Sequence, residues 1–298
     1  MEKEFYCSDI AWEHGVPLIG TATRGDIWFL IEYPGRWGAK AFEESNIPHD
    51  IKDYLLGLKH PEVEVRILLI KQSESRHRGR ITFFVVQTFA LEPRLYKFRL
   101  DNYSDILDLD LSPILAGIPG GTAHLRHDPL YLVCTNGIRD KCCAVYGPEV
   151  YKSMKAEAGE NVWQSSHIGG HNQSPIMLFF PHGLNYAHTT PSEARRLVQA
   201  YQRGQVVLHH YRGRVCYETH IQAAEHFWRQ KTGELTLPGP QIEAVDILGE
   251  DEWIVTINQA DGSNEERIHL KRRFSDYVIP TTCTKSKQSK IASFHWIE

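Results

Sequence analysis

Residues 129–143 read PLYLVCTNGIRDKCC and residues 162–171 read VWQSSHIGGH, and these two stretches decide the interpretation of the chain. Each opens with a short apolar run typical of a buried strand. Each then ends in cysteine or histidine, the side chains that bind soft and borderline metals. The two stretches therefore predict two strands whose ends bring metal ligands together.

The segments around these stretches predict an α/β arrangement. Proline suits the first turn of a helix, so a helix is expected from Pro148 to Ala158. Hairpin strands are expected at 176–181 and 184–189, followed by a helix at 192–202. With the strands at 129–133 and 162–165, the order is β-α-β-β-β-α. This is the order of a thioredoxin-like fold.

The N-terminal part repeats nearly the same order. The expected elements are strands at 27–33, 63–70, 81–89 and 95–100, a helix at 50–58 and a short helix at 101–109. The glycine- and proline-rich residues 115–122 predict a linker between the two halves. We infer an internal duplication, in which two thioredoxin-like lobes follow each other in the chain.

Three domains are expected on this basis. An N-terminal lobe without ligands spans 1–114, and a lobe carrying the ligands spans 123–204. Residues 205–298 form a C-terminal extension. It contains a helix at 221–230 and β-strands around 253–257 and 267–270.

Composition and charge exclude several classes of protein. The 298 residues are 42% hydrophobic, which suffices for a substantial core. A net charge of -4 excludes a generally basic nucleic-acid binder, and 23% charged residues exclude a disordered acidic chain. No segment resembles a signal peptide or approaches the roughly 18 apolar residues of a membrane span. We therefore expect no nucleic-acid partner, no membrane span and a cytoplasmic location, where thiols stay reduced.

Cysteines and histidines converge in the second lobe. Cys134, Cys142 and Cys143 lie within ten positions, and His167 and His171 follow the next strand. In a reducing compartment such a cluster indicates metal ligands or reactive thiols rather than disulfides. Two thiolates and two imidazoles suit either zinc or an iron–sulfur cluster.

Spacing favours the cluster over zinc. Structural zinc usually takes its cysteines from a tight C-x(2–4)-C knuckle. Here seven residues separate Cys134 from Cys142, and eight separate it from Cys143. A wide loop fits a bulkier two-iron cluster better. The H-x3-H spacing also occurs in zinc fingers and does not discriminate. Gly169 and Gly170 between the histidines disfavour a helix and indicate that the backbone closely approaches the cluster.

These motifs together resemble the sucrase/ferredoxin-like family, a branch of the thioredoxin-like 2Fe–2S ferredoxins. The family pattern is a C-x8-C loop with an Arg-Asp pair, then H-x3-H with internal glycines. The matching residues here are Cys134, Arg139, Asp140, Cys143, His167 and His171. The stretches CSDIAWEHGVPLIGTA and WFLIEYPGRWG are also similar to the family's opening. The resemblance covers roughly residues 7–190.

One position departs from the family pattern. Many members carry arginine before the second cysteine and glycine after it, where this chain has Cys142 and Ala144. The eight-residue gap favours Cys143 as the ligand, with Cys142 as the alternative.

The resemblance implies a thioredoxin-like ferredoxin fold and a 2Fe–2S cofactor. Cys134 and Cys143 would bind one iron, and His167 and His171 the other. Arg139, Asp140, Gly169 and Gly170 would surround the ligands. Neutral imidazoles in place of thiolates raise the reduction potential and make it depend on pH. The chain would then be a proton-coupled electron carrier rather than an enzyme.

The implied partners are a separate reductase and an acceptor protein, because no dinucleotide fingerprint occurs in the chain. The family name includes a sucrase, but no carboxylate pair of a glycosidase is identifiable.

Two other interpretations remain open. One is a structural Cys2His2 zinc site in a protein that binds something else. The other is a thiol-dependent redox enzyme that uses Cys142 or Cys143 with His167 as its base. No C-x-x-C motif supports this last interpretation.

Expectations also follow for three other cysteines and for one peptide bond. Cys7, Cys216 and Cys283 are isolated in sequence and are interpreted as buried or inert thiols. The bond between Ser174 and Pro175 precedes a strand that faces the proposed site. Thioredoxin folds often place a cis-proline there, so we expect a cis peptide.

Overall fold

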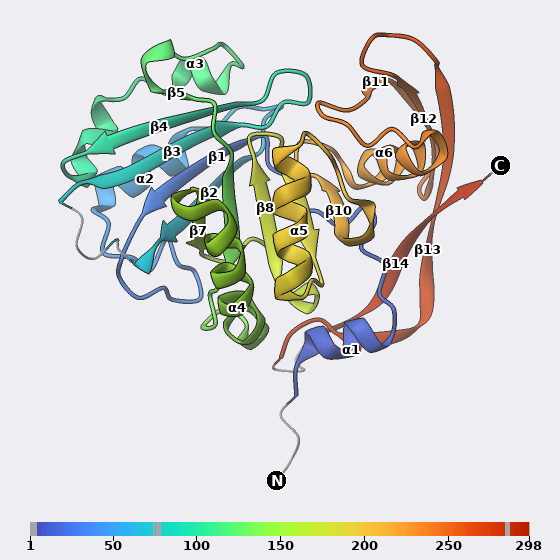
Figure 1. The fold of residues 1–298 in the computed structure, drawn as a ribbon, viewed down its shortest axis with the longest axis horizontal. Coiled ribbons are helices and arrows are strands. Elements are labelled where there is room, and N and C mark those ends of the chain that lie inside the picture. The colour runs from blue at the N-terminus through green and yellow to red at the C-terminus, as the bar shows by residue number, and fades with distance from the viewer. Residues whose placement is uncertain (1–4, 74, 76–78, 284–286, 298) are drawn as a thin grey trace.

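A ten-stranded mixed sheet and a four-stranded antiparallel sheet organise this computed structural model (Figure 1). The structure describes residues 5–73, 75, 79–283 and 287–297, and the side chain of His171 lies outside the described part. The strands of the large sheet are β1 (Ile27–Glu32), β2 (Val65–Lys71), β3 (Ile81–Gln87), β4 (Arg94–Leu100), β5 (Leu125–Arg126), β6 (Leu130–Cys134), β7 (Val162–Ser165), β8 (Ile176–Phe180), β9 (Leu184–Ala187) and β10 (Tyr211–Arg214). They lie in the order β10-β9-β8-β6-β7-β2-β1-β3-β4-β5.

The smaller sheet and the helices complete the fold. The sheet contains β11 (Gln241–Gly249), β12 (Glu252–Asn258), β13 (Glu266–Pro280) and β14 (Gln288–Ile297) in that order. The α-helices are α1 (Cys7–Glu13), α2 (His49–Gly57), α3 (Ser112–Leu115), α4 (Lys141–Ala158), α5 (Pro191–Gln202) and α6 (Thr219–Thr232). The expected mixed α/β fold with a C-terminal β-rich extension is confirmed. None of the helices in the described residues is long and apolar enough to span a membrane.

Two sets of four strands in the large sheet have the same connectivity. In the first, β1 pairs in parallel with β2 and antiparallel with β3, and β3 pairs antiparallel with β4. In the second, β6 pairs in parallel with β7 and antiparallel with β8, and β8 pairs antiparallel with β9. Helix α2 connects the parallel strands of the first set, and α4 those of the second. We call these sets, with their helices, the first and second lobes.

The two lobes join through their equivalent strands β2 and β7. These strands pair antiparallel over a short register, Ile70 with Ser165 and Lys71 with Gln164. Ser166 continues this junction, because its backbone N–H donates to the carbonyl of Leu69 at 2.8 Å. The carboxyl ends of β2 and β7 therefore meet at the lobe junction.

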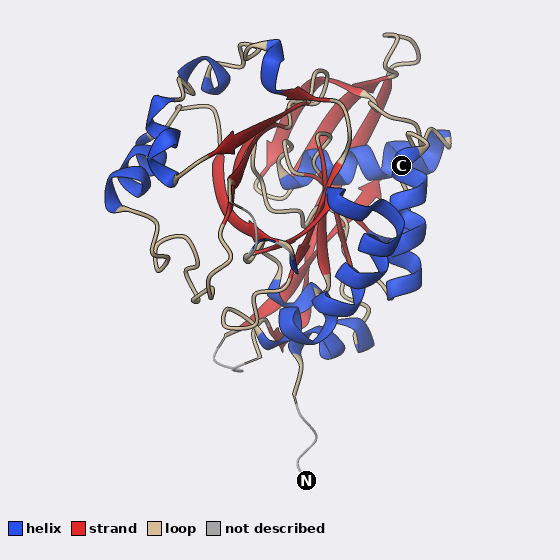
Figure 2. Ribbon diagram, turned by 60° about the vertical axis from the view of Figure 1, so that its left-hand side comes forward, coloured by secondary structure: helices blue, strands red, loops and turns tan. Residues whose placement is uncertain are grey.

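The sheet curves so that the lobes share a core on its inner side (Figure 2). Trp28 from β1 contacts Phe180 from β8 with ring centroids 5.6 Å apart, although their strands are not neighbours in the sheet. Strand β6 sends Leu132 and Cys134 into this shared core and Val133 to the opposite face, under α4 and α5. Period-two alternation thus turns Cys134 toward the interior between the lobes.

Helix α4 begins seven residues earlier than its sequence predicts. The expected start at Pro148 is wrong, because Asp140 caps the helix by accepting the backbone N–H of Cys142 at 3.0 Å. Pro148 lies inside the helix and forfeits one backbone hydrogen bond there. Burial of Val150 and Met154 against the sheet keeps the helix continuous across this position. The first turn of α4, rather than a loop, therefore carries Cys142 and Cys143.

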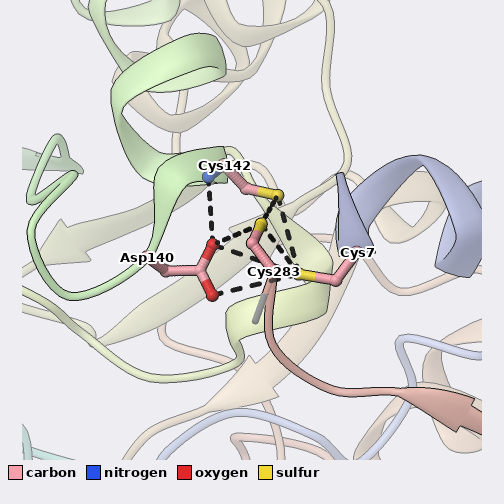
Figure 3. A group of neighbouring side chains, drawn as sticks. All are labelled: Cys7, Asp140, Cys142 and Cys283. Atoms are coloured by element: carbon pink, nitrogen blue, oxygen red, sulfur yellow. Dashed lines mark hydrogen bonds between the residues drawn. The ribbon is translucent and has the colours of Figure 1, made fainter. Parts of the chain in front are cut away.

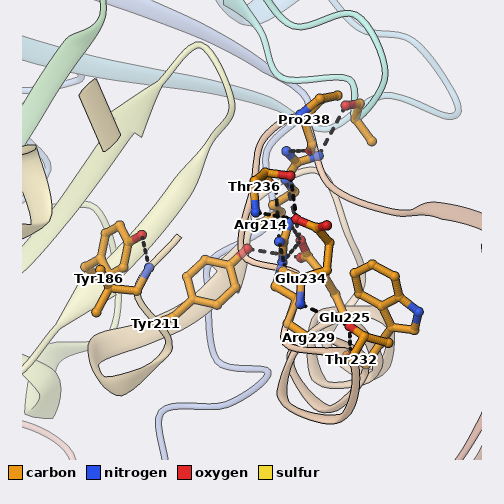
Figure 4. A network of polar contacts seen from close by, with 12 residues as sticks. Tyr186, Tyr211, Arg214, Glu225, Arg229, Thr232, Glu234, Thr236 and Pro238 are labelled. Atoms are coloured by element: carbon orange, nitrogen blue, oxygen red, sulfur yellow. Dashed lines mark hydrogen bonds and ion pairs between the residues drawn. The ribbon is translucent and has the colours of Figure 1, made fainter. Parts of the chain in front are cut away.

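The four-stranded sheet packs on α6, and α6 joins the large sheet through a buried network of charges (Figure 4). Glu225 on α6 accepts two hydrogen bonds of 3.0 Å from Arg229 and one of 3.0 Å from the Tyr211 hydroxyl on β10. Arg214 lies 3.8 Å from the same carboxylate, and these charged side chains are almost fully buried. The network fixes α6 against the edge of the large sheet.

Candidate metal centre

Cys134, Cys143 and His167 converge beside the lobe junction. Cys134 ends β6, Cys143 lies in the first turn of α4, and His167 follows β7. The two sulfurs are 3.3 Å apart, and His167 Nδ1 lies 3.8 Å from each of them. Both cysteines are fully buried, and His167 is half-buried. Two thiols and an imidazole thus form a compact triangle of metal donors.

The two sulfurs have opposite acidities. Contacts with Cys143 and His167 hold the pKa of Cys134 well below its ordinary value despite burial. The same contact with Cys134, together with burial, raises the pKa of Cys143 well above its ordinary value. The pair therefore favours one thiolate and one thiol, with the remaining proton shared between the two sulfurs. A cation that replaced this proton would stabilise both thiolates.

Close packing of α4 against β6 holds the cysteines together. Gly147 lies on the helix, and a Cβ there would come within 2.3 Å of the Cys134 carbonyl oxygen. Only glycine allows this approach of the helix to the end of the strand.

The histidine loop needs its two glycines for backbone geometry. Gly169 and Gly170 have φ of +120° and +76°. A Cβ at Gly169 would lie 2.1 Å from the Thr23 hydroxyl, and one at Gly170 would lie 2.6 Å from Arg212 Nη2. The expectation that residues 167–171 are not one helix is confirmed, since a 3-10 turn begins only at His171. In the structure the two glycines lie close to Thr23 and Arg212, and the sequence does not predict these contacts.

Arg212 is a buried cation packed against this loop. It is 2% exposed, and burial lowers its pKa to about 9. Its hydrogen-bond acceptors in the described structure are neutral oxygens, namely those of Thr21 and Asn185. The guanidinium therefore places a positive charge beside the loop that carries both predicted histidine ligands.

Ser174 also contacts the centre, and the sequence interpretation missed this. Its hydroxyl lies 3.4 Å from the Cys143 sulfur, and its carbonyl accepts the Ser8 hydroxyl at 2.6 Å. The peptide between Ser174 and Pro175 is cis, as expected. The expected cis peptide could have indicated this contact, because it placed the turn at Ser174 and Pro175 beside the proposed site.

A second group forms next to the first from Cys7, Asp140, Cys142 and Cys283 (Figure 3). These residues come from α1, the N-cap of α4, its first turn, and the segment between β13 and β14. Cys7 and Cys283 are isolated in sequence, but the fold brings both to Cys142; Cys7 is buried, as expected, and Cys283 is half-buried. Cys216 lies outside both groups, and burial raises its pKa to about 12.

The remaining predicted residues divide between these groups and the surface. Adjacent Cys142 and Cys143 belong to different groups. Asp140 serves as a helix cap and a member of the second group, whereas Arg139 is exposed. The side chain of His171 lies outside the described residues.

Comparison with known families decides the classification. The model of the sucrase/ferredoxin-like family matches residues 18–213, which contain all four predicted ligands. The chain belongs to the sucrase/ferredoxin-like family. No curated protein and no solved structure matches the chain. The family match therefore covers both lobes, most of β10 and the centre, and it leaves Cys7 and Cys283 outside.

The donor set of this family member fits a metal or an iron–sulfur cluster. Two thiolates bound 2.3 Å from one tetrahedral metal lie about 3.8 Å apart, and a thiolate and an imidazole about 3.5 Å apart. The observed separations of 3.3 Å and 3.8 Å are close to these values. Cys134, Cys143 and His167 would supply three ligands to one metal ion with little movement, whereas a two-iron cluster would place His167 on the second iron, farther from the sulfurs.

Proposed function

We propose that the chain is an electron carrier that holds a 2Fe–2S cluster through Cys134, Cys143, His167 and His171. The observation that carries this proposal is the buried triangle of two sulfurs and one imidazole nitrogen. Such a cluster accepts and donates single electrons, and histidine ligation raises its potential relative to all-cysteine ligation. The family match and the wide C-x8-C spacing support the same assignment.

Burial and charge around the triangle suit an anionic cofactor. Cys134 and Cys143 are fully buried in the core shared by the lobes, which excludes water from the sulfurs. Arg212, packed on the histidine loop, supplies a buried positive charge. In a low-dielectric interior such a charge stabilises added negative charge more than it would in water. The surroundings thus favour acceptance of an electron.

The proton-coupled part of the proposal rests on His167. Its Nδ1 faces both sulfurs, so Nε2 is the nitrogen that would hold or release a proton. An imidazole that ligates through one nitrogen loses its other proton more easily when the metal is oxidised. We therefore expect the potential to fall as pH rises.

Partner proteins would reach the centre from the β6–α4 connection. Ile138, Arg139 and Lys141 are exposed there, and the Ile138 side chain is 72% exposed. An exposed apolar residue flanked by cations suits transient docking of a redox protein with an acidic surface. A separate reductase and acceptor would use this surface.

We propose that both lobes are thioredoxin-like and arose by internal duplication. The matching connectivity of β1–β4 and β6–β9 supports this. Residues 1–114 and 123–204 would be the two domains and 205–298 the extension, although β10 pairs with the large sheet.

A structural zinc site is the second candidate. The observation in its favour is that His167 Nδ1 lies equally far, 3.8 Å, from both sulfurs. One tetrahedral ion would produce such a triangle. A thiol enzyme has less support, because Cys142 and Cys143 are fully buried and reactive cysteines require access.

Metal analysis of the full chain, purified without oxygen, tests the proposal. Iron, acid-labile sulfide and zinc are measured on one sample together with its visible absorption. We expect a brown protein with about two irons and two sulfides per chain, bleached by dithionite. A colourless protein in which zinc is lost on Cys134→Ser would replace the cluster with the zinc site.

A further inference from the structure

Three cysteines and one aspartate meet where three distant parts of the chain cross (Figure 3). The sulfur–sulfur distances are 3.6 Å for Cys7–Cys142, 3.6 Å for Cys7–Cys283 and 3.2 Å for Cys142–Cys283. Asp140 Oδ1 lies 3.2 Å from Cys283, and its two oxygens lie 4.0 and 3.9 Å from Cys7. One ligand atom from each of these four side chains lies within 4.8 Å of the other three, and four donors suffice for a tetrahedral site.

The distances distinguish metal ligation from disulfide bonding. A disulfide requires sulfurs about 2.05 Å apart, and all three cysteines are free thiols. Around one zinc ion, thiolate pairs lie about 3.8 Å apart and thiolate–carboxylate pairs about 3.6 Å apart. The observed values cluster near this geometry. Asp140 Oδ1 caps α4, which leaves Oδ2, 3.9 Å from the Cys7 sulfur, available to bind a metal.

Hydrogen bonds to the sulfurs point the same way. The backbone N–H of Ser8 donates to the Cys142 sulfur, and the backbone N–H of Cys7 donates to the Cys283 sulfur. Backbone N–H donors of this kind stabilise metal-bound thiolates and orient them. Packing of neutral thiols alone needs neither these donors nor the carboxylate.

We propose that Cys7, Asp140, Cys142 and Cys283 bind one structural zinc ion. Binding would release the thiol protons to solvent and leave a closed Cys3Asp site with no position for substrate. The site would fasten α1 and the β13–β14 connection to the first turn of α4. Cys7 and Cys283 lie outside the family match, whereas Asp140 and Cys142 lie inside it. The zinc would therefore attach both ends of the chain to the part that carries the cluster ligands.

The test measures zinc and iron separately in the full chain and its variants. Cys7→Ser and Cys283→Ser each remove one proposed zinc ligand, and Cys134→Ser removes one proposed cluster ligand. Cys216→Ser is the matched control, since this half-buried cysteine belongs to neither group. We expect about one zinc per wild-type chain and at least a five-fold loss in Cys7→Ser and Cys283→Ser. Iron should persist in those variants, and zinc should persist in Cys134→Ser and Cys216→Ser.

A second measurement remains informative if a variant folds poorly. Wild-type protein is treated with a zinc chelator and then with limiting trypsin. We expect cleavage after Arg273, Lys287 and Lys290 to accelerate at least five-fold, because β13 and β14 lose their attachment at Cys283, and added zinc should restore protection. Cleavage elsewhere should change little.

The outcomes separate this inference from the proposed function. Zinc lost on Cys283→Ser in a protein without iron would support the inference and refute the cluster. Zinc lost on Cys134→Ser but retained in Cys283→Ser would overturn the inference. It would also be overturned by a wild-type chain whose three cysteines are metal-free, joined in a disulfide or bound to iron.

Discussion

The two lobes of the large sheet share their connectivity and differ in what lies at the ends of their parallel strands. In the second lobe, two thiols and an imidazole meet there. In the first lobe, the Lys71 ammonium at the end of β2 lies 4.0 Å from the ring of Trp37 and donates to the Gly35 carbonyl at 3.4 Å. Residues 27–100 contain no cysteine. One arrangement of strands thus supports a cation–aromatic contact in one copy and metal donors in the other.

This difference shows that the fold supplies the place and the side chains supply the chemistry. In both lobes the chain leaves a parallel strand and turns near the lobe junction. Such ends of strands collect side chains from separate segments, which is why ligands bind there in α/β proteins. The first lobe then serves as a support, because its inner face closes the core around Cys134 and Cys143.

The largest expected effect comes from removing a sulfur of the second lobe. Cys143→Ser should abolish the visible absorption and lower the iron content at least ten-fold, because serine is a poor ligand for iron–sulfur clusters. Absorption and metal content measure this, and Cys216→Ser should keep both. A variant that retained a full cluster would assign the second thiolate ligand to another residue, and Cys142→Ser would then be examined.

The sequence predicts the positions of most strands and helices, and it predicts that only the second lobe carries metal ligands. Strands and helices of both lobes lie close to their expected positions, because apolar alternation and turn residues mark them. The predicted start of α4 was wrong because Pro148 is also an acceptable first-turn residue. Only the structure shows that Asp140 caps the helix earlier in the chain. The second cysteine group was not predictable. Cys7 and Cys283 are 276 positions apart, and no spacing pattern connects them.

A smaller change in the same site should alter the potential without removing the cluster. His167→Cys replaces a neutral ligand with a thiolate, which stabilises the oxidised state. We expect the potential to fall by about 100 mV or more and its pH dependence to weaken. The wild-type slope should approach about -59 mV per pH unit for one proton per electron. Redox titrations at several pH values measure both, and equal slopes in the two proteins would contradict a proton held on His167.

Acid should loosen the second lobe before the first. Burial lowers the pKa of His182 and of His188 to about 4, whereas both titrate near 6.5 in an unfolded chain. Between these values the unfolded chain binds protons that the folded chain does not. Stability should therefore fall as pH drops from about 6.5 to 4, by up to about 3 kcal/mol for each histidine. Hydrogen exchange of β6–β9 against β1–β4 across this range measures the difference.

The acid prediction has a direct control. His182 contacts the Tyr201 hydroxyl at 2.6 Å, and His182→Gln keeps a polar group there without a titrating proton. The pH dependence of exchange in β8 and β9 should become shallower in this variant. Unchanged dependence would show that other groups control the acid response.

The smallest expected effect separates the histidine loop from an ordinary turn. Gly170 and Gly204 have similar φ, +76° and +71°, but a Cβ at Gly204 meets nothing within 4 Å. Gly204→Ala should cost about 1 kcal/mol of stability, and Gly170→Ala roughly 3 kcal/mol, because it also displaces the buried Arg212. Denaturant unfolding of both variants measures this. An equal loss of stability in the two variants would mean that Arg212 can move away from residue 170 without loss of stability.

The most direct test of the central claim is electron–nuclear double resonance on the dithionite-reduced full chain, labelled with ¹⁵N only in histidine. Strong coupling to two histidine nitrogens in the wild type, reduced to one in His167→Cys, is the result that this account predicts. A reduced cluster without histidine coupling, or coupling that persists unchanged in His167→Cys, would contradict Cys2His2 ligation in the second lobe.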